Sequence, residues 1–247
     1  MTSHNSVNAT AEASYETLVD VVGQAFEATG RKIAVFDADG TLWRGDLGEV
    51  HLQHLGDSMP GKSSAHELYL EACREDVERG YRLGTQVLAP RSESLVYETC
   101  EATWEVHRTQ LFSYVLPLFE AIESMGGEVW IVSASHRWII EVAVRELGIP
   151  AERVIAGDLE CIDSKLTSRV IEPFPNGIGK AKAIAKKIGS TPRVAFGNSR
   201  HDLHMLECAE SAVLIWDESS KPESLIALSR ERGWTVYEGV VESVSGA

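Results

Sequence analysis

The residues best suited to chemistry in this sequence are two aspartates, Asp37 and Asp39, which directly follow a short apolar stretch. Two carboxylates so close together repel each other unless a cation lies between them, and Mg²⁺ prefers such hard oxygen ligands. Residues two apart in an extended chain point to the same side. The pair therefore predicts a metal-assisted site in which one carboxylate attacks and the other carries a proton.

Other polar residues of the same kind follow later apolar stretches. Ser133 comes after the second stretch, Lys180 at the start of a predicted helix, and Asn198 and Asp202 after a third stretch. Ligands of open α/β sheets bind at the carboxyl ends of the strands, so we expect these side chains to converge there. A lysine and a divalent cation would neutralise a transferring phosphoryl group, and a serine with backbone N–H groups would orient it.

The elements that must position these residues follow from the apolar pattern. Continuous apolar stretches predict buried strands, and apolar residues at helical spacing predict amphipathic helices. Strands and helices alternate, which indicates an α/β fold with a Rossmann-like parallel sheet and helices on both faces. The expected strands are 32–36, 128–132, 153–156, 193–196, 212–215 and 235–237, with a hairpin at 159–171, and the expected helices are 16–28, 118–125, 137–147, 178–188, 202–209 and 222–232.

The segment between the first two strands has a different pattern. It is helical and charged, without strand-type alternation, and it divides into pieces at 47–55, 65–81 and 91–115. Such a segment is too long for a plain loop in a compact domain. We expect an inserted helical domain over residues 44–115 and a core domain formed by residues 1–43 and 116–247.

Composition excludes several classes of protein. The chain has 247 residues, with 23 basic against 37 acidic residues and a formal net charge of −14, which disfavours nucleic-acid binding. No apolar stretch is long enough to span a membrane. Four scattered cysteines without a CxxC pair predict neither a zinc knuckle nor a disulfide framework, and Met1–Ser14 lacks the pattern of a secretory signal. We therefore expect a cytoplasmic protein that binds neither nucleic acid nor membrane.

Four short motifs resemble those of the haloacid dehalogenase-like superfamily, which consists mostly of phosphatases. Residues 36–42 (FDADGTL) resemble its motif I, and residues 131–135 (IVSAS) resemble motif II. Gly179-Lys180 resembles motif III, and residues 197–202 (GNSRHD) resemble motif IV. Order and spacing match over residues 31–237, and the helical insert lies where the phosphoserine-phosphatase-like branch carries its C1-type cap.

This resemblance implies roles for the motif residues. Asp37 is the nucleophile that forms an aspartyl-phosphate, and Asp39 is the general acid and base. Dehalogenases usually lack the second aspartate, so Asp39 favours phosphoryl chemistry. The implied phosphate-binding residues are Thr41, Ser133, Ala134 and Lys180, and the implied Mg²⁺ ligands are Asp37, Asp39 (also through its backbone carbonyl), Asn198 and Asp202.

Motif IV differs from the usual pattern at its first position. Asn198 occupies a place where the family commonly has an aspartate that binds Mg²⁺ directly. An amide oxygen can still act as a ligand but carries no charge. Two outcomes are therefore open: the metal binds more weakly, or Asp202 moves from an outer to an inner position around the metal.

Residues beside motifs I and II are candidates for substrate contact. After motif I come Trp43, Arg44, Asp46 and Glu49, which we expect to face the cleft, while His136 and Arg137 follow motif II. Trp43 with acids nearby could form a cage for a cationic head group, and plain packing between insert and core is the alternative. His136 and Arg137 could instead be surface residues at a helix start.

We expect a Mg²⁺-dependent phosphomonoester hydrolase that acts on a small phosphorylated metabolite. One alternative is a phosphotransferase that passes the phosphoryl group to an acceptor other than water. Another is a phosphate-binding or signalling protein without hydrolytic activity, because receiver domains also combine acids, a hydroxyl and a lysine on an α/β sheet. The sequence leaves the substrate and the oligomeric state open.

Overall fold

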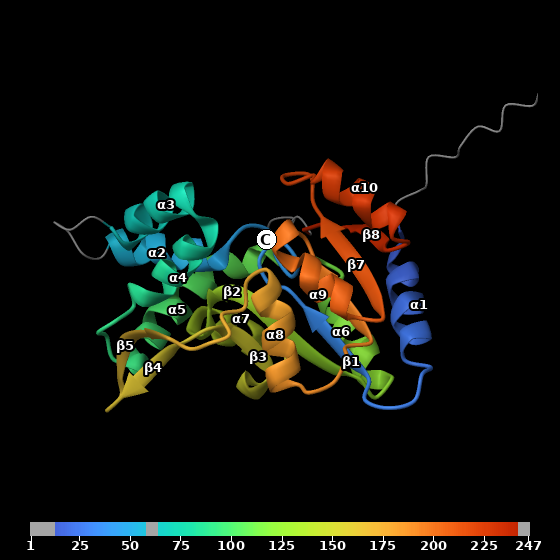
Figure 1. Ribbon diagram of the computed structural model, residues 1–247, viewed down its shortest axis with the longest axis horizontal. Helices are drawn as coiled ribbons and strands as arrows, with labels where there is room; N and C mark the ends of the chain where they lie inside the picture. The colour runs from blue at the N-terminus through green and yellow to red at the C-terminus, as the bar shows by residue number, and fades with distance from the viewer. Residues whose placement is uncertain (1–12, 58–63, 242–247) are drawn as a thin grey trace, which may run out of the picture.

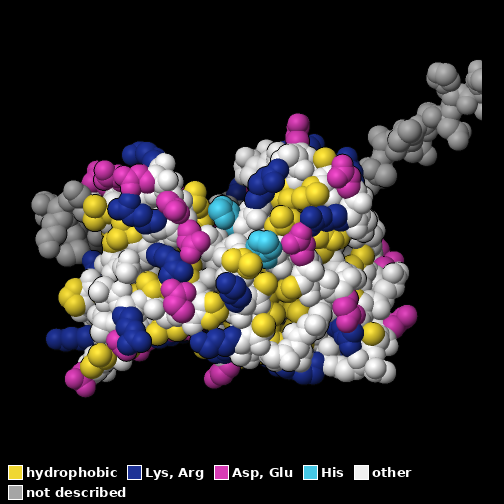
Figure 2. Space-filling model, viewed as in Figure 1, with side chains coloured by type: hydrophobic (Ala, Val, Ile, Leu, Met, Phe, Trp, Pro, Cys, Tyr) yellow, Lys and Arg dark blue, Asp and Glu magenta, His cyan; other side chains and the backbone are white. Residues whose placement is uncertain are grey.

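A computed structural model of the chain describes residues 13–57 and 64–241. The prediction about a secretory signal therefore falls mostly outside the described residues, as do both ends of the expected core domain. Within the described ranges, no helix is both long and apolar enough to cross a membrane. Figure 2 shows acidic and basic side chains intermixed over one face of the molecule, rather than gathered into a large area of either sign.

The centre of the fold is a parallel sheet of six strands in the order β3-β2-β1-β6-β7-β8 (Figure 1). Every neighbouring pair is parallel, which confirms the predicted α/β class. β2 runs four residues beyond its predicted end, so that residues 133–136 belong to the strand. The strands are β1 (Ile33–Phe36), β2 (Glu128–His136), β3 (Val154–Gly157), β6 (Val194–Gly197), β7 (Ser211–Trp216) and β8 (Thr235–Glu238).

Helices cover both faces of the sheet, which explains why its strands read as continuous apolar stretches. In β1, Ala34 and Phe36 pack on one face with residues of α1, α6 and α7. Ile33 and Val35 pack on the other face with residues of α8 and α9. These helices are α1 (Tyr15–Ala25), α6 (Val115–Ser124), α7 (Arg137–Arg145), α8 (Ile178–Lys187) and α9 (Leu203–Cys208), and α10 (Glu223–Glu231) packs against β7 and β8.

The segment between β1 and β2 is helical, as predicted, and its helices lie at one end of the sheet (Figure 1, left). The expected piece 65–81 is two helices, because Asp76 is extended and its carboxylate caps the second helix by accepting from Arg79 N at 3.0 Å. The expected piece 91–115 ends early at His107, and α6 begins at Val115. The four helices are α2 (Leu47–Asp57), α3 (Ala65–Glu75), α4 (Val77–Gln86) and α5 (Glu93–His107).

The insert and the sheet share one apolar core. Leu47, Leu52 and Val96 of the insert belong to the same buried cluster as Phe36 and Ile131 of the sheet. The predicted hairpin is present as β4 (Leu159–Ile162) and β5 (Lys165–Val170), and it packs against α4. The division into two domains at residues 44 and 115 stays a prediction, because this cluster is continuous across it.

Candidate active site

Asp37 lies at the carboxyl end of the central strand, where its backbone N–H still bonds to Phe196 O at 2.9 Å. The chain then turns sharply, with Gly40 at φ +74°. A Cβ on Gly40 would lie 2.0 Å from Asn198 Nδ2, so only glycine allows the turn after β1 to approach the loop after β6. This contact brings motifs I and IV together.

Lys180 joins the two carboxylates that the sequence predicted to converge. Its Nζ lies 2.5 Å from Asp37 Oδ1, 2.6 Å from Asp202 Oδ1 and 2.8 Å from Val132 O. The lysine is only 1 % exposed. An ammonium group has three protons, so each of them is engaged by one of these acceptors. Thr41 Oγ1 donates to the other carboxylate oxygen of Asp37 at 3.1 Å.

Burial and neighbouring charges set the protonation of this cluster. Burial and the carboxylate of Asp202 raise the pKa of Asp37 to about 7, although Lys180 acts in the opposite direction. For Lys180, burial disfavours the charged form, but Asp202 and Asp37 outweigh it and raise the pKa to about 12. Burial also opposes ionisation of Asp202, yet Lys180 and the donors of Ser199 lower its pKa. One ammonium therefore does not balance both carboxylates, and a further cation would favour the ionised form of Asp37.

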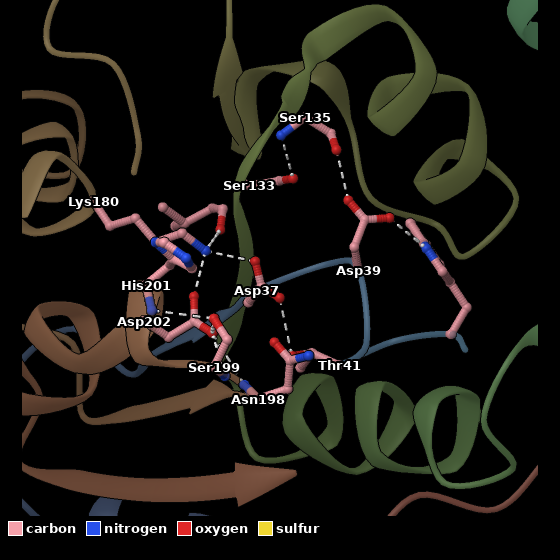
Figure 3. A network of polar contacts seen from close by, with 12 residues as sticks. Asp37, Asp39, Thr41, Ser133, Ser135, Lys180, Asn198, Ser199, His201 and Asp202 are labelled. Carbon is pink, nitrogen blue, oxygen red and sulfur yellow. Dashed lines mark hydrogen bonds and ion pairs between the residues drawn. The ribbon is translucent and has the colours of Figure 1, made fainter. Parts of the chain in front are cut away.

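The carboxylate of Asp39 is held by a different set of donors. Oδ1 accepts from Trp43 Nε1 at 2.8 Å and from Leu47 N at 2.7 Å. Oδ2 accepts from Ser135 Oγ at 2.7 Å, and Ser135 N in turn donates to Ser133 Oγ at 3.0 Å. Figure 3 shows Asp39 directed toward Ser135, while Asp37 is directed toward Lys180. The two acids thus have separate partners beside one cavity, which suits separate roles.

The loop after β6 is organised by Asp202. Its Oδ2 accepts from Ser199 N and Ser199 Oγ, both at 2.9 Å, and from Asn198 N at 3.1 Å. Because Oδ1 is bonded to Lys180, both oxygens of Asp202 are engaged by the protein itself. To bind a metal directly, Asp202 would use an oxygen that also accepts these hydrogen bonds, or it would lose its hydrogen bond to Lys180. The side chains of Asp37, Asp39 and Asn198 offer further oxygens, and this all-oxygen set with excess negative charge fits Mg²⁺.

These residues line a cavity of about 320 Å³. Tyr81 of α4 reaches it from the insert and makes an edge-on ring contact with His201, with centroids 5.9 Å apart. Ala134 lies in the wall beside Ser133. Sequence reasoning expected Asp46 to face this cleft, and the cavity wall includes it. It missed other lining residues, of which Ser135 lies in motif II and Ser199 and His201 lie in motif IV. The missed residues are Tyr81, Ser135, Asn176, Ser199, His201, Asp217, Ser219 and Ser220.

The candidates for substrate contact after motif I have other partners. Trp43 is fully buried, with its ring 5.5 Å from that of Trp104, which favours the packing alternative over a cage for a cationic head group. Arg44 pairs with Asp217 at 2.8 Å. Glu49 pairs with His66 at 2.9 Å and lines a smaller adjoining pocket.

The two candidates after motif II tie the insert to the core. His136 is buried, and its Nε2 lies 2.9 Å from Nδ1 of His51 on α2. Arg137 bonds to Glu93 of α5, to Asp158 at 2.6 Å and to Glu141 at 3.2 Å. Neither side chain lines the main cavity, whereas His136 lines the smaller adjoining pocket together with Glu49. Both side chains connect the insert to the core, and their contact with substrate stays a prediction.

Comparisons with known proteins indicate the family and the fold of the chain. The family model described as haloacid dehalogenase-like hydrolase matches residues 34–207. Phosphoserine phosphatase SerB2 of Mycobacterium tuberculosis is 27% identical over 206 residues, which cover 81% of this chain and 47% of that one. The chain thus spans about half the length of this relative.

Solved structures show the same fold. A protein of unknown function from Bordetella pertussis Tohama I gives a TM-score of 0.72 at 20% identity, covering 85% of this chain and 99% of that one. A structure described as a phospho-aspartyl intermediate analogue of phosphoserine phosphatase gives a TM-score of 0.58 at 18% identity, covering 87% of this chain and 96% of that one. At these identities the similarity concerns the fold.

Proposed function

Because the chain belongs to the haloacid dehalogenase-like hydrolases, we propose that it is a Mg²⁺-dependent phosphomonoester hydrolase acting on a small phosphorylated metabolite. The observation that carries the proposal is the buried cluster of Asp37, Lys180 and Asp202 at the carboxyl edge of the sheet. A carboxylate nucleophile beside a cation is the arrangement that in-line phosphoryl transfer needs. The names of the relatives support the same reaction class.

Asp37 is the nucleophile in this proposal. One of its oxygens attacks phosphorus, the bond to the alcohol oxygen breaks, and Asp39 gives its proton to the leaving alkoxide. Asp39 then takes a proton from water, which attacks the aspartyl-phosphate and releases inorganic phosphate and Asp37. The separate donors of Asp39 keep its carboxylate apart from Lys180, so that the two acids can perform different steps.

Lys180, Ser133 and Ala134 hold the phosphoryl group. Lys180 offers charge, while the Ser133 hydroxyl and the Ala134 backbone N–H offer donors from the same wall. Because all three N–H groups of Lys180 already donate, one hydrogen bond must change from its present acceptor to a phosphoryl oxygen when substrate binds. Asp37, Asp39 and Asn198, with Asp202, would hold Mg²⁺, which when bound supplies charge neutralisation at the phosphoryl oxygens.

The cavity limits the substrate to a small molecule. Its volume of about 320 Å³ is at the lower end of the range for ligand sites. The ring contact between Tyr81 of the insert and His201 of the core lies in the cavity wall, and in this proposal movement of α4 separates the two rings for product release. The four cysteines are unpaired thiols, which supports placement in a reducing compartment such as the cytoplasm.

A phosphate-release screen over a panel of metabolite esters tests the proposal. We expect release by the parent protein with Mg²⁺ and its loss in Asp37→Asn, while Asp20→Asn on the exposed face of α1 behaves as the parent. Adding an alcohol acceptor tests for the phosphotransferase, which would yield a phosphorylated acceptor in place of inorganic phosphate. Equal release by Asp37→Asn and the parent would remove Asp37 from its role.

A further inference from the structure

The loop before α8 places an unused amide in the wall of the catalytic cavity. Asn176 is 7 % exposed, and its Oδ1 is buried without a hydrogen-bond partner. Two other buried side-chain atoms of the described residues share this property, but Trp104 Nε1 lies in the core and Ser229 Oγ lies on α10. A buried acceptor without a partner destabilises the folded state, so an unused one beside catalytic residues calls for a ligand.

The backbone fixes Asn176 without help from its side chain. Asn176 N donates to Phe174 O at 2.9 Å, and Asn176 O accepts from Gly179 N at 2.8 Å. A Cβ on Gly179 would lie 1.9 Å from Phe174 O, so this turn is tightly packed. A rigid loop therefore holds Asn176 in the cavity wall, four residues before Lys180. Oδ1 itself is shielded from solvent, so the side-chain amide has to rotate to bring this oxygen to a bound molecule.

We infer that Asn176 binds the substrate, with Oδ1 accepting a hydrogen bond from an O–H or N–H group on the alcohol part of the phosphate ester. This inference rests on the proposed function. The oxygens of an ionised phosphoryl group only accept hydrogen bonds, so they cannot satisfy Oδ1. An O–H or N–H group on the organic part of the substrate can satisfy it, and the esters below distinguish this donor from a bound water.

The charge of the cavity points the same way. Of the described residues that line it, five are aspartates (Asp37, Asp39, Asp46, Asp202 and Asp217) and one is a lysine, Lys180. Hydrogen-bond acceptors thus predominate over cationic donors in the wall. A substrate whose alcohol part carries hydroxyl or amino donors complements this wall better than a purely apolar ester does.

Matched esters of similar size test the inference. The probes are 2-hydroxyethyl and 2-aminoethyl phosphate, which carry a donor, and n-propyl phosphate, which carries none. We expect Asn176→Ala to lose about 10- to 100-fold in kcat/KM on the two donor esters and to change little on n-propyl phosphate. Ser229→Ala, which removes a buried unpartnered oxygen far along the chain, is the matched control and keeps the parent's preference.

A second variant identifies the atom and protects the test against misfolding. Asn176→Asp keeps an oxygen acceptor, so the ratio of kcat/KM between donor and propyl esters stays close to that of the parent. Loss of that ratio in Asn176→Asp would assign the contact to the amide NH₂ and overturn the inference, as would an unchanged ratio in Asn176→Ala. An equal loss on all three esters, which a contact with the phosphoryl group or a metal-bound water would give, also overturns it. If the parent releases phosphate from no ester of any panel, the proposed function itself fails.

Discussion

Lys180 Nζ lies 2.6 Å from Asp202 Oδ1, and both side chains are almost completely buried. The pair links the start of α8 to the loop after β6, two segments that the sequence separates by 22 positions. Breaking one side of a buried ion pair leaves an uncompensated charge, which costs more than losing an exposed pair. The same lysine that would bind the phosphoryl group therefore also stabilises the fold.

Removal of the Lys180 charge is expected to destabilise the protein strongly. Lys180→Met leaves Asp37 and Asp202 buried without a cation, and we expect a loss of about 3–5 kcal/mol in the free energy of unfolding. Urea denaturation of the variant and the parent protein measures this loss. Lys182→Met, at an exposed position of α8, is the control and changes stability little. Equal stability of both variants would contradict the assigned role of the pair.

Asp37 is expected to make stability depend on pH. Its pKa is raised from 3.8 to about 7 in the folded protein, so the folded state binds more protons than the unfolded state between these values. The contribution of Asp37 to the free energy of unfolding is fully present below the unfolded pKa and is lost as the pH rises through about 7. Between these two values the free energy of unfolding falls by up to about 1.4 kcal/mol per pH unit. Urea titrations without metal, from pH 4 to 8, should show this decline in the parent and its absence in Asp37→Asn. Parallel curves for the two proteins would refute the assignment.

Asn198→Asp is expected to tighten Mg²⁺ binding. Asn198 lines the cavity beside the turn at Gly40, and an aspartate there adds a charged ligand oxygen. We expect the Mg²⁺ concentration for half-maximal phosphate release to fall by about tenfold, since charge count tunes affinity. An unchanged activation curve would count against Asn198 as a ligand.

Ser135→Ala tests how Asp39 is positioned. The variant removes the hydroxyl that donates to Asp39 Oδ2, so the acid should lose its fixed orientation. We expect kcat to fall by about tenfold with little change in KM, because the bond orients a proton-transfer group rather than the substrate. Ser124→Ala, at an exposed position of α6, is the control. A change in KM alone would show that Ser135 contacts the substrate instead.

His51 and His136 form a directed hydrogen-bond chain between the insert and the core. Ile139 N donates to His136 Nδ1, so the proton of the neutral ring lies on Nε2 and is donated to His51 Nδ1. His51 Nε2 then donates to Thr99 Oγ1 at 2.9 Å. Burial lowers the pKa of both histidines, to about 3 for His51, which keeps this neutral arrangement.

His51→Leu is expected to cost about 1–3 kcal/mol in the free energy of unfolding, because the buried His136 Nε2 loses its acceptor. Chemical denaturation at neutral pH measures the loss. His204→Leu, at a partly exposed position of α9, provides the comparison. Equal stability of the two variants would show that the chain contributes nothing.

The sequence predicted the elements of the sheet well because both faces are buried and the apolar stretches are unbroken. It also predicted Asp37, Lys180 and Asp202 as neighbours, since parallel strands end at one edge. Local spacing could not show that Trp43 faces the core or that Arg137 is surrounded by three carboxylates. Two of the partners of Arg137, Asp158 and Glu93, lie 21 and 44 positions away along the chain and are brought close only by packing.

Residues of the cavity wall were harder to predict for the same reason. Tyr81 lines the cavity from α4, a helix that the sequence pattern had joined with α3 into a single piece. Asn176 lies in an irregular loop between a hairpin and a helix, where no periodicity indicates orientation. Both positions depend on the tertiary arrangement rather than on any repeating pattern.

The insert and the sheet share one apolar core, and this limits how far the helices of the insert can be replaced by those of another family member. Leu47 and Val96 are buried in the same cluster as Phe36. Deleting the helices of the insert, α2 to α5, would therefore expose apolar side chains of the central strand. The helices of the insert therefore cannot be exchanged as an independent unit. Replacing these helices with those of a relative would require redesign of the buried contacts between helices and sheet and of the connecting loops. Substrate specificity in this chain can be engineered more safely at single positions of the cavity wall.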